Sequence, residues 1–235
     1  RQIIKGNFSL IVVLLSYLDT VFNIMSTKLN GWNLFWVITI PISLVVVLTM
    51  ASADLSSGEA VSSLIQLTVR FSVPWLYLAF VASSLHVVFP SVFSRWLLRN
   101  RKIIGLCFAL AMAWQLFFIL WVVGIYTQYY MQEVYVLSDA IEGTVGYLFL
   151  IAMVLTSFKF GRSRLNPKQW KFLHKCGIYY LWAYAWSVYW FNIFYYQSPN
   201  SIDYLYYWAG FLVWGLRLSA WSKKRWQQTG AQSPA

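Results

Sequence analysis

The sequence is poor in charge, and above all in acidic residues. Only 11% of its 235 residues are charged, only seven are Asp or Glu, and 60% are hydrophobic. Soluble domains are nearer a quarter charged, so a soluble globular protein is excluded. The apolar runs are about 17–25 residues long, as in spanning helices, whereas barrel strands alternate over about 10 residues. The sequence therefore predicts an all-α, polytopic membrane helix bundle.

Residues that carry enzyme or metal chemistry are also scarce. The chain has two cysteines and two histidines, which give neither a disulfide framework nor a metal site. It contains no P-loop, no Gly-rich dinucleotide motif and no HExxH helix. No nucleophile can be paired with an adjacent base, so the sequence does not support nucleophilic or acid–base catalysis of the kind that soluble enzymes use. We expect no metal beyond a haem iron, and an enzymatic role only as a membrane oxidoreductase subunit.

The charge that is present is mostly basic, with a formal net charge of +11. Three blocks, 94–102, 159–175 and 217–225, hold 14 of the 18 Lys and Arg residues. They lie at the ends of apolar runs, which is the positive-inside pattern of membrane proteins and not that of a nucleic-acid-binding surface. We expect no nucleic-acid partner, and a multi-pass protein of the bacterial inner (cytoplasmic) membrane, with a cytoplasmic C-terminus and a periplasmic N-terminus.

Seven spans can be predicted, and six, with the N-terminus inside, if the first segment does not cross. Their approximate ranges are 8–25, 34–50, 69–89, 103–125, 141–158, 173–196 and 204–220. We divide the chain into added N-terminal helices with a polar loop (1–58), a helix bundle (59–220) and a basic cytoplasmic tail whose end is disordered (221–235).

The two histidines are the candidate cofactor ligands. The topology places both His86 and His174 in the cytoplasmic leaflet, so they are candidate axial ligands of one haem b. The alternative is structural: His174 lies at headgroup level among lysines, and His86 is buried and bonded to Ser83 or to the backbone.

The sixth span is unusually aromatic, with the run IYYLWAYAWSVYWFNIFYY at 178–196. These rings either line a pocket for a flat ligand such as haem, a quinone or a pigment, or serve interface anchoring and helix packing.

Several short motifs follow one another in the order seen in a known family. They are Thr68-Val-Arg70-Phe71, Arg101-Lys-Ile-Ile-Gly105-Leu106, Thr144-Val-Gly146, Thr156-Ser157, Leu165 to His174 with Trp170, and Gly215-Leu-Arg217-Leu. Over about residues 60–220 the chain resembles the ferric-reductase-like transmembrane family, and most closely the haem-binding membrane subunit of bacterial methionine sulfoxide reductase systems.

The resemblance implies haem b and electron transfer from a cytoplasmic flavin or quinol donor, but some of the family's haem-ligand histidines are absent from this sequence. Two positions that carry haem-ligating histidines in the family hold Gln115 and Ser187 here, and only His174 is kept. We therefore expect a haem-poor accessory or structural subunit of a larger membrane assembly, in contact with membrane lipids and other subunits. Lipid, quinone, flavin or pigment are candidate ligands. The alternative is an electron carrier with at most one haem b, held by His86 and His174.

Overall fold

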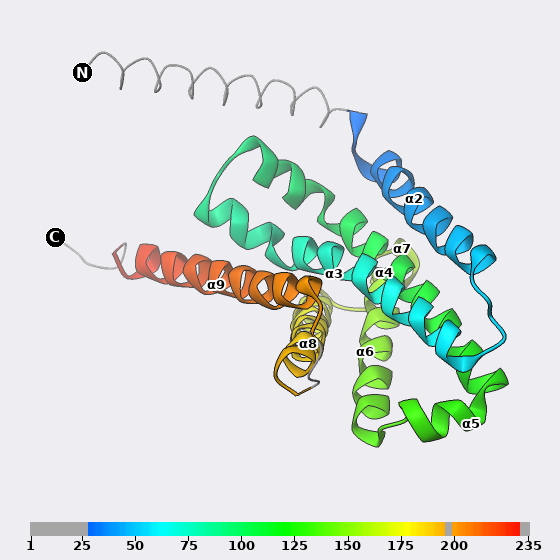
Figure 1. Cartoon of the computed structure of the whole chain (residues 1–235). Coiled ribbons are helices and arrows are strands. Elements are labelled where there is room, and N and C mark those ends of the chain that lie inside the picture. The colour runs from blue at the N-terminus through cyan, green and yellow to red at the C-terminus, as the bar shows by residue number, and fades with distance from the viewer. Residues whose placement is uncertain (1–27, 196–198, 231–235) are drawn as a thin grey trace, which may run out of the picture.

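The computed structural model describes residues 28–195 and 199–230, which form helices joined by short connections, with no β-strand in these ranges (Figure 1). The predicted first span, 8–25, lies outside the described residues. The elements are α2 (Gly31–Ser52), α3 (Gly58–Val88), α4 (Val92–Ile125), α5 (Thr127–Tyr129), the π-helix η1 (Tyr130–Val134), α6 (Leu137–Leu155), α7 (Lys159–Arg162), α8 (Pro167–Phe194) and α9 (Ser201–Gly230). The all-α prediction is confirmed.

Four of these helices are long and apolar enough to cross a membrane, namely α2, α3, α4 and α6. Helices α8 and α9 are also long, with 28 and 30 residues, but they do not meet the same criterion of apolar composition. Both carry basic residues among their apolar ones. The seven-span count is thus supported for four of the predicted segments.

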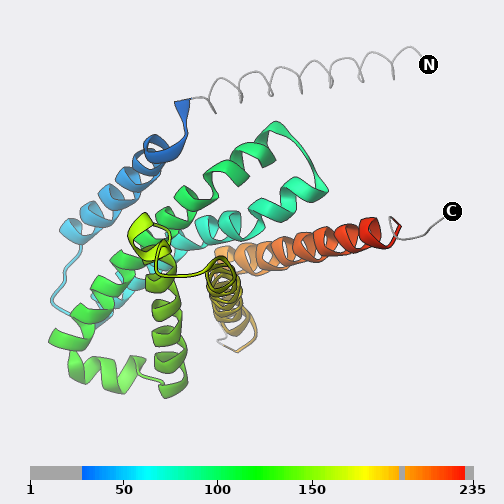
Figure 2. The ribbon, with the colours of Figure 1, turned by 180° about the vertical axis from the view of Figure 1, so that it is seen from behind.

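The antiparallel pair α3 and α4 forms the centre of the bundle (Figure 1). Helix α2 packs against α4, α9 packs against α3, and α8 lies between α9 and α6. Seen from behind, α7 and the start of α8 lie beside the end of α6 (Figure 2). The main core includes fully buried Phe80, Leu97 and Ile104. A smaller cluster around Val46 and Phe118 joins α2, α3 and α4.

Several helix boundaries differ from the predicted ones, and at two of the starts a capping residue begins the helix early. Ser57 caps α3, so this helix begins at Gly58 inside the predicted polar loop. The basic run 94–102 is also helical, since Ser91 and Ser94 form a capping box at the start of α4. Helix α9 continues to Gly230, into the predicted tail.

The Asn166-Pro167 pair, which interrupts a helix in most settings, begins one here. Asn166 Oδ1 accepts from Gln169 N at 2.8 Å, and Gln169 Oε1 accepts from Asn166 N at 3.0 Å. Pro167 occupies the first helical position, where its missing N–H costs nothing. This capping box fixes the entry of the aromatic helix α8.

A second proline explains a contact between distant helices. Pro74 lies inside α3 and has no N–H, so the carbonyl of Arg70, four residues earlier, loses its helical partner. The hydroxyl of Tyr206 on α9 donates to that carbonyl at 2.9 Å. Tyr77 of α3 in turn donates to the carbonyl of Tyr206 at 3.1 Å. These bonds hold α9 parallel to α3.

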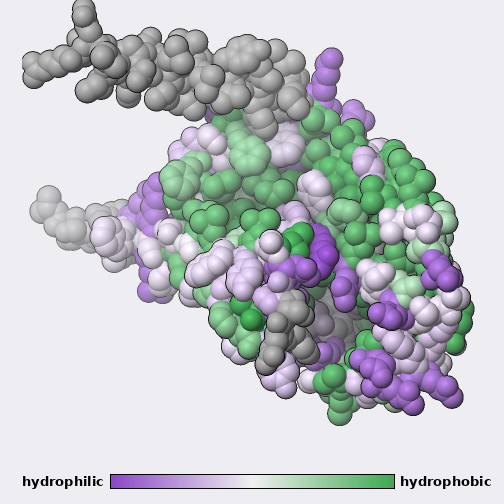
Figure 3. Space-filling model, in the orientation of Figure 1, coloured by the Kyte–Doolittle hydropathy of each residue, from purple (hydrophilic) through white to green (hydrophobic). Residues whose placement is uncertain are grey.

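Apolar and polar residues are unevenly distributed on the face shown in Figure 3. Hydrophobic residues form a broad surface over α2 and α4, and hydrophilic residues gather at the edge near α5 and the start of α6. Trp36, Ile40 and Leu48 of α2 are each more than half exposed. In water such a surface would be unfavourable, whereas acyl chains of a bilayer cover it without cost.

Candidate functional site

A cavity of about 460 Å³ lies between five helices. It is lined by the first half of α4, the end of α6 and the first half of α8, together with Ala79 of α3 and Arg217 of α9. Five basic side chains line it, and no carboxylate does. We call it the basic cavity. The basic residues are Arg101, Lys102, Lys171, Lys175 and Arg217. They come from all three basic blocks of the sequence, which the fold brings to one place.

The two arginines are held by neighbouring carbonyls of α3. Arg101 Nε donates to the carbonyl of Ala79 at 3.0 Å, and Arg217 Nη1 donates to that of Phe80 at 2.9 Å. Because these carbonyls are consecutive, the two guanidinium groups are brought to adjacent positions on α3. Each guanidinium has five N–H donors in a fixed fork, so most of them remain for a ligand.

Aromatic rings fix Arg217 further. Its Cζ lies 4.3 Å from the ring centre of Phe80 and 4.4 Å from that of Tyr179. Both distances are within the range of cation–π attraction. The guanidinium is therefore positioned before any ligand arrives.

His174 also lines the basic cavity, and its surroundings are well defined. Its Nε2 lies 3.0 Å from Thr156 Oγ1, at the end of α6. Trp170 packs against the imidazole with ring centres 4.4 Å apart, and its Nε1 donates to the carbonyl of Thr156 at 3.1 Å. Arg162 in turn lies over the Trp170 ring at 4.8 Å. His174 thus ties α8 to the end of α6.

His86 lies elsewhere, near the end of α3. Its Nδ1 is 3.1 Å from Ser94 Oγ on α4, so its hydroxyl partner is Ser94 and not the predicted Ser83. About two turns of α3 separate it from the basic cavity, which it does not line. His86 is seven positions, or about 10 Å of helix, beyond the lining residue Ala79. A haem shared by His86 and His174 stays a prediction. His86 could keep its Nδ1 contact with Ser94 and offer Nε2 to iron, whereas His174 would have to give up the Thr156 contact of its Nε2 or bind through Nδ1.

The two positions that the predicted resemblance aligns with haem-ligating histidines differ from each other. Gln115 lines a second cavity of about 430 Å³ between α4 and α6, and its buried Oε1 has no hydrogen-bond partner. Ser187 is bonded within its own helix, to the carbonyl of Tyr184 at 2.8 Å. Tyr184, one helical turn earlier, lines the same cavity as Gln115. An amide and a hydroxyl do not match the axial ligands of haem b proteins, so these positions do not fit that group.

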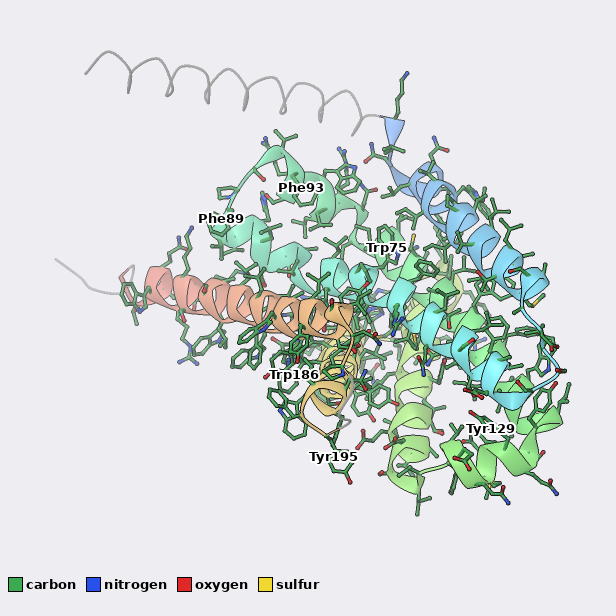
Figure 4. The ribbon with its side chains drawn as sticks, viewed as in Figure 1. Trp75, Phe89, Phe93, Tyr129, Trp186 and Tyr195 are labelled. Carbon is green, nitrogen blue, oxygen red and sulfur yellow. The ribbon has the colours of Figure 1, made fainter. Side chains whose placement is uncertain are left out.

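The aromatic residues of α8 serve mainly to pack helices. Trp182 stacks on Phe80 at 5.3 Å and on Trp214 at 6.2 Å. Trp186 lies between α8 and α9 (Figure 4) and stacks on Tyr207 at 5.6 Å. Neither tryptophan lines the basic cavity or the Gln115 cavity. The packing interpretation of this run is the one that these contacts support.

Sequence reasoning singled out His174 but gave Arg101 and Arg217 only as family landmarks. The signal was present for Arg217, because it interrupts an apolar run, and intramembrane cations mark functional sites. For Arg101 the sequence gave no separate signal, because the positive-inside pattern already explains a basic residue near a helix end. In the part of the chain that the structure describes, no three His, Cys, Asp or Glu residues form a group suited to a metal ion.

The fold and its apolar helices define the chain as a helical, multi-pass membrane protein. In comparisons with protein-family models, curated proteins and solved structures, nothing matches the chain.

Proposed function

We propose that the protein is an accessory or structural subunit of a larger membrane assembly, with a ferric-reductase-like helix bundle that lacks the ligands of the family's outer haem. The observation that carries this proposal is the state of the two aligned positions. Gln115 presents an unpartnered amide oxygen to a cavity, and the Ser187 hydroxyl is bonded to its own helix.

The histidines support the same function. Both link two helices through a hydroxyl group, His86 to Ser94 and His174 to Thr156. Helix-to-helix hydrogen bonds of this kind stabilise a membrane bundle by about 0.6–2 kcal/mol each. A subunit that keeps its scaffold and uses its histidines for packing needs no haem to fold. We place it in the bacterial inner membrane with its basic end at the cytoplasm.

One observation favours a second candidate, the carrier of a single haem b. His174 lines the basic cavity beside Arg101 and Arg217, and arginines pair with carboxylates such as haem propionates. His86 does not line that cavity, so the second axial ligand would come from a rearrangement.

An absorption spectrum of the purified, dithionite-reduced protein separates the two candidates. After haem-replete expression, the accessory function predicts no stoichiometric b-type α-band. A stoichiometric band that disappears in His86→Ala or His174→Ala would overturn it and establish the carrier.

A gain of binding tests the fold resemblance separately. Ser187 follows Tyr184 by three residues, so it is a near neighbour on the α8 surface. If the bundle is ferric-reductase-like, Gln115→His combined with Ser187→His should introduce a b-type spectrum that neither single variant gives. A correctly folded double variant without haem would refute the family assignment while leaving the membrane fold intact.

A further inference from the structure

We propose that the basic cavity binds the phosphate of an anionic phospholipid, with the phosphate at Arg101 and Arg217 and the acyl chains along the apolar walls. This inference does not depend on the ferric-reductase resemblance, because it rests on the charge, shape and position of the cavity alone.

The charge of the site is one-sided. Five cations line the cavity, and the described acidic residues lie outside it. On α9, Asp203 is 14 residues from Arg217, or about 21 Å along the helix. Like charges gathered without a counter-ion repel one another, and a bound anion relieves this repulsion. An anionic group is therefore the ligand that the basic cavity favours.

The hydrogen-bond donors are already in position. Each arginine is fixed by a backbone carbonyl of α3, and Arg217 also packs against the rings of Phe80 and Tyr179. Two guanidinium forks at adjacent sites suit the tetrahedral oxygens of a phosphate, which arginine binds in a bidentate manner. Little side-chain entropy is lost when the ligand binds.

Apart from Ser157 and His174, the other lining residues are apolar, which argues for a lipid. Leu106, Leu150 and Val154 line the basic cavity and also a third, almost wholly apolar cavity of about 330 Å³ between α2, α4 and α6. The shared residues make one apolar tract that leads away from the phosphate site toward Trp32 of α2. A soluble phosphate compound has no use for such a tract, whereas an acyl chain fills it.

The position in the membrane fits the same ligand. Arg101 is the tenth residue of α4 and His174 the eighth of α8, so the cavity lies near the ends of these helices. Headgroup phosphates occupy that depth, and basic pockets between transmembrane helices bind anionic headgroups. The volume of about 460 Å³ lies within the usual range for small-ligand sites.

Binding can be measured by native mass spectrometry and thermal stability of the full chain in detergent. The probes are dioleoyl-phosphatidylglycerol, dioleoyl-phosphatidylcholine, which carries the same chains with a cationic choline, and inorganic phosphate without chains. Arg217→Gln removes one fork, and Gly105→Phe fills the cavity without changing charge, because a Cβ at Gly105 meets no atom within 4 Å. Arg225→Gln is the matched control on α9, since Arg225 does not line the cavity.

We expect the phosphatidylglycerol to bind at least about ten-fold more tightly than the phosphatidylcholine, because both carry the same phosphate and only choline adds a positive charge beside the five cations. Arg217→Gln and Gly105→Phe should each lose this preference by a similar factor, and Arg225→Gln should keep it. Arg217→Lys should fall between, because it keeps the charge but loses the fork.

Three results would overturn the proposal. Equal binding of both lipids would show that charge does not select the ligand. An equal loss in Arg225→Gln and Arg217→Gln would assign the preference to diffuse surface charge. Stabilisation by inorganic phosphate as strong as that by the lipid would make a soluble anion the ligand. If Arg217→Gln does not fold, the proposal is still tested by comparing the lipid preference of the unmodified chain with that of Gly105→Phe.

Discussion

A close approach between helices that a simple substitution can test lies at Gly210 of α9. A Cβ built there would lie 2.6 Å from Cδ1 of Trp186 on α8 and 2.9 Å from the hydroxyl oxygen of Tyr77 on α3. The Gly210 carbonyl also accepts from Trp182 Nε1 at 3.2 Å. Glycine is needed at this crossing because α8 and α3 both approach the α9 backbone. We therefore expect Gly210→Ala to destabilise the bundle.

Gly215, on the same helix, provides the matched control, because a Cβ there meets no atom within 4 Å. Alanine is favoured over glycine in a helix by about 1 kcal/mol, and both variants gain this. Overpacking costs typically about 1–3 kcal/mol, and only Gly210→Ala incurs it. The difference between the two variants is thus the packing term alone.

The difference should be visible as a melting temperature in detergent, followed by tryptophan fluorescence. At about 2–4 °C per kcal/mol for a chain of this size, Gly210→Ala should melt roughly 2–12 °C below Gly215→Ala. Gly215→Ala should equal or exceed the unmodified protein. If Gly210→Ala melts at or above Gly215→Ala, the helices do not approach as closely as described, and the packing of α9 is wrong.

Three further substitutions test hydrogen bonds that join or begin helices. Tyr206→Phe should destabilise the protein by about 1–3 kcal/mol, because the carbonyl of Arg70, which Pro74 leaves without a helical donor, loses the Tyr206 hydroxyl. In a Pro74→Ala background the same substitution should cost less. An equal cost of Tyr206→Phe in the two backgrounds would contradict this. Asn166→Ala should lower the unfolding free energy by about 1 kcal/mol through loss of the α8 cap, whereas Asn166→Ser should retain most of it. Thr156→Val should cost about 1–3 kcal/mol because the His174 imidazole loses its partner, and Thr156→Ser should not, in the same melting assay.

The sequence by itself determined the class of fold and several local features. Long apolar runs with few charges lie in the bilayer, where a helix hydrogen-bonds all of its backbone N–H and C=O groups internally. The all-α prediction therefore followed from the length and composition of these runs. Capping was also local: Ser57, Ser91 and Asn166 begin helices through side chains at fixed short spacings. The predicted fourth span starts near 103, whereas α4 starts at Val92, because the Ser91 capping box begins the helix before the basic run and lysine and arginine are good helix formers.

Only the tertiary structure decided which basic residues share a site. Arg101 and Arg217 are 116 positions apart, and nothing local relates them. They come together because α4 and α9 both pack on α3 and bind consecutive carbonyls of that helix. Their pairing depends on helix crossings, and those crossings depend on close contacts such as that at Gly210. The positions of the basic blocks in the sequence indicated that they lie at one end of the bundle. Only the packing of the helices places residues of these blocks around the basic cavity.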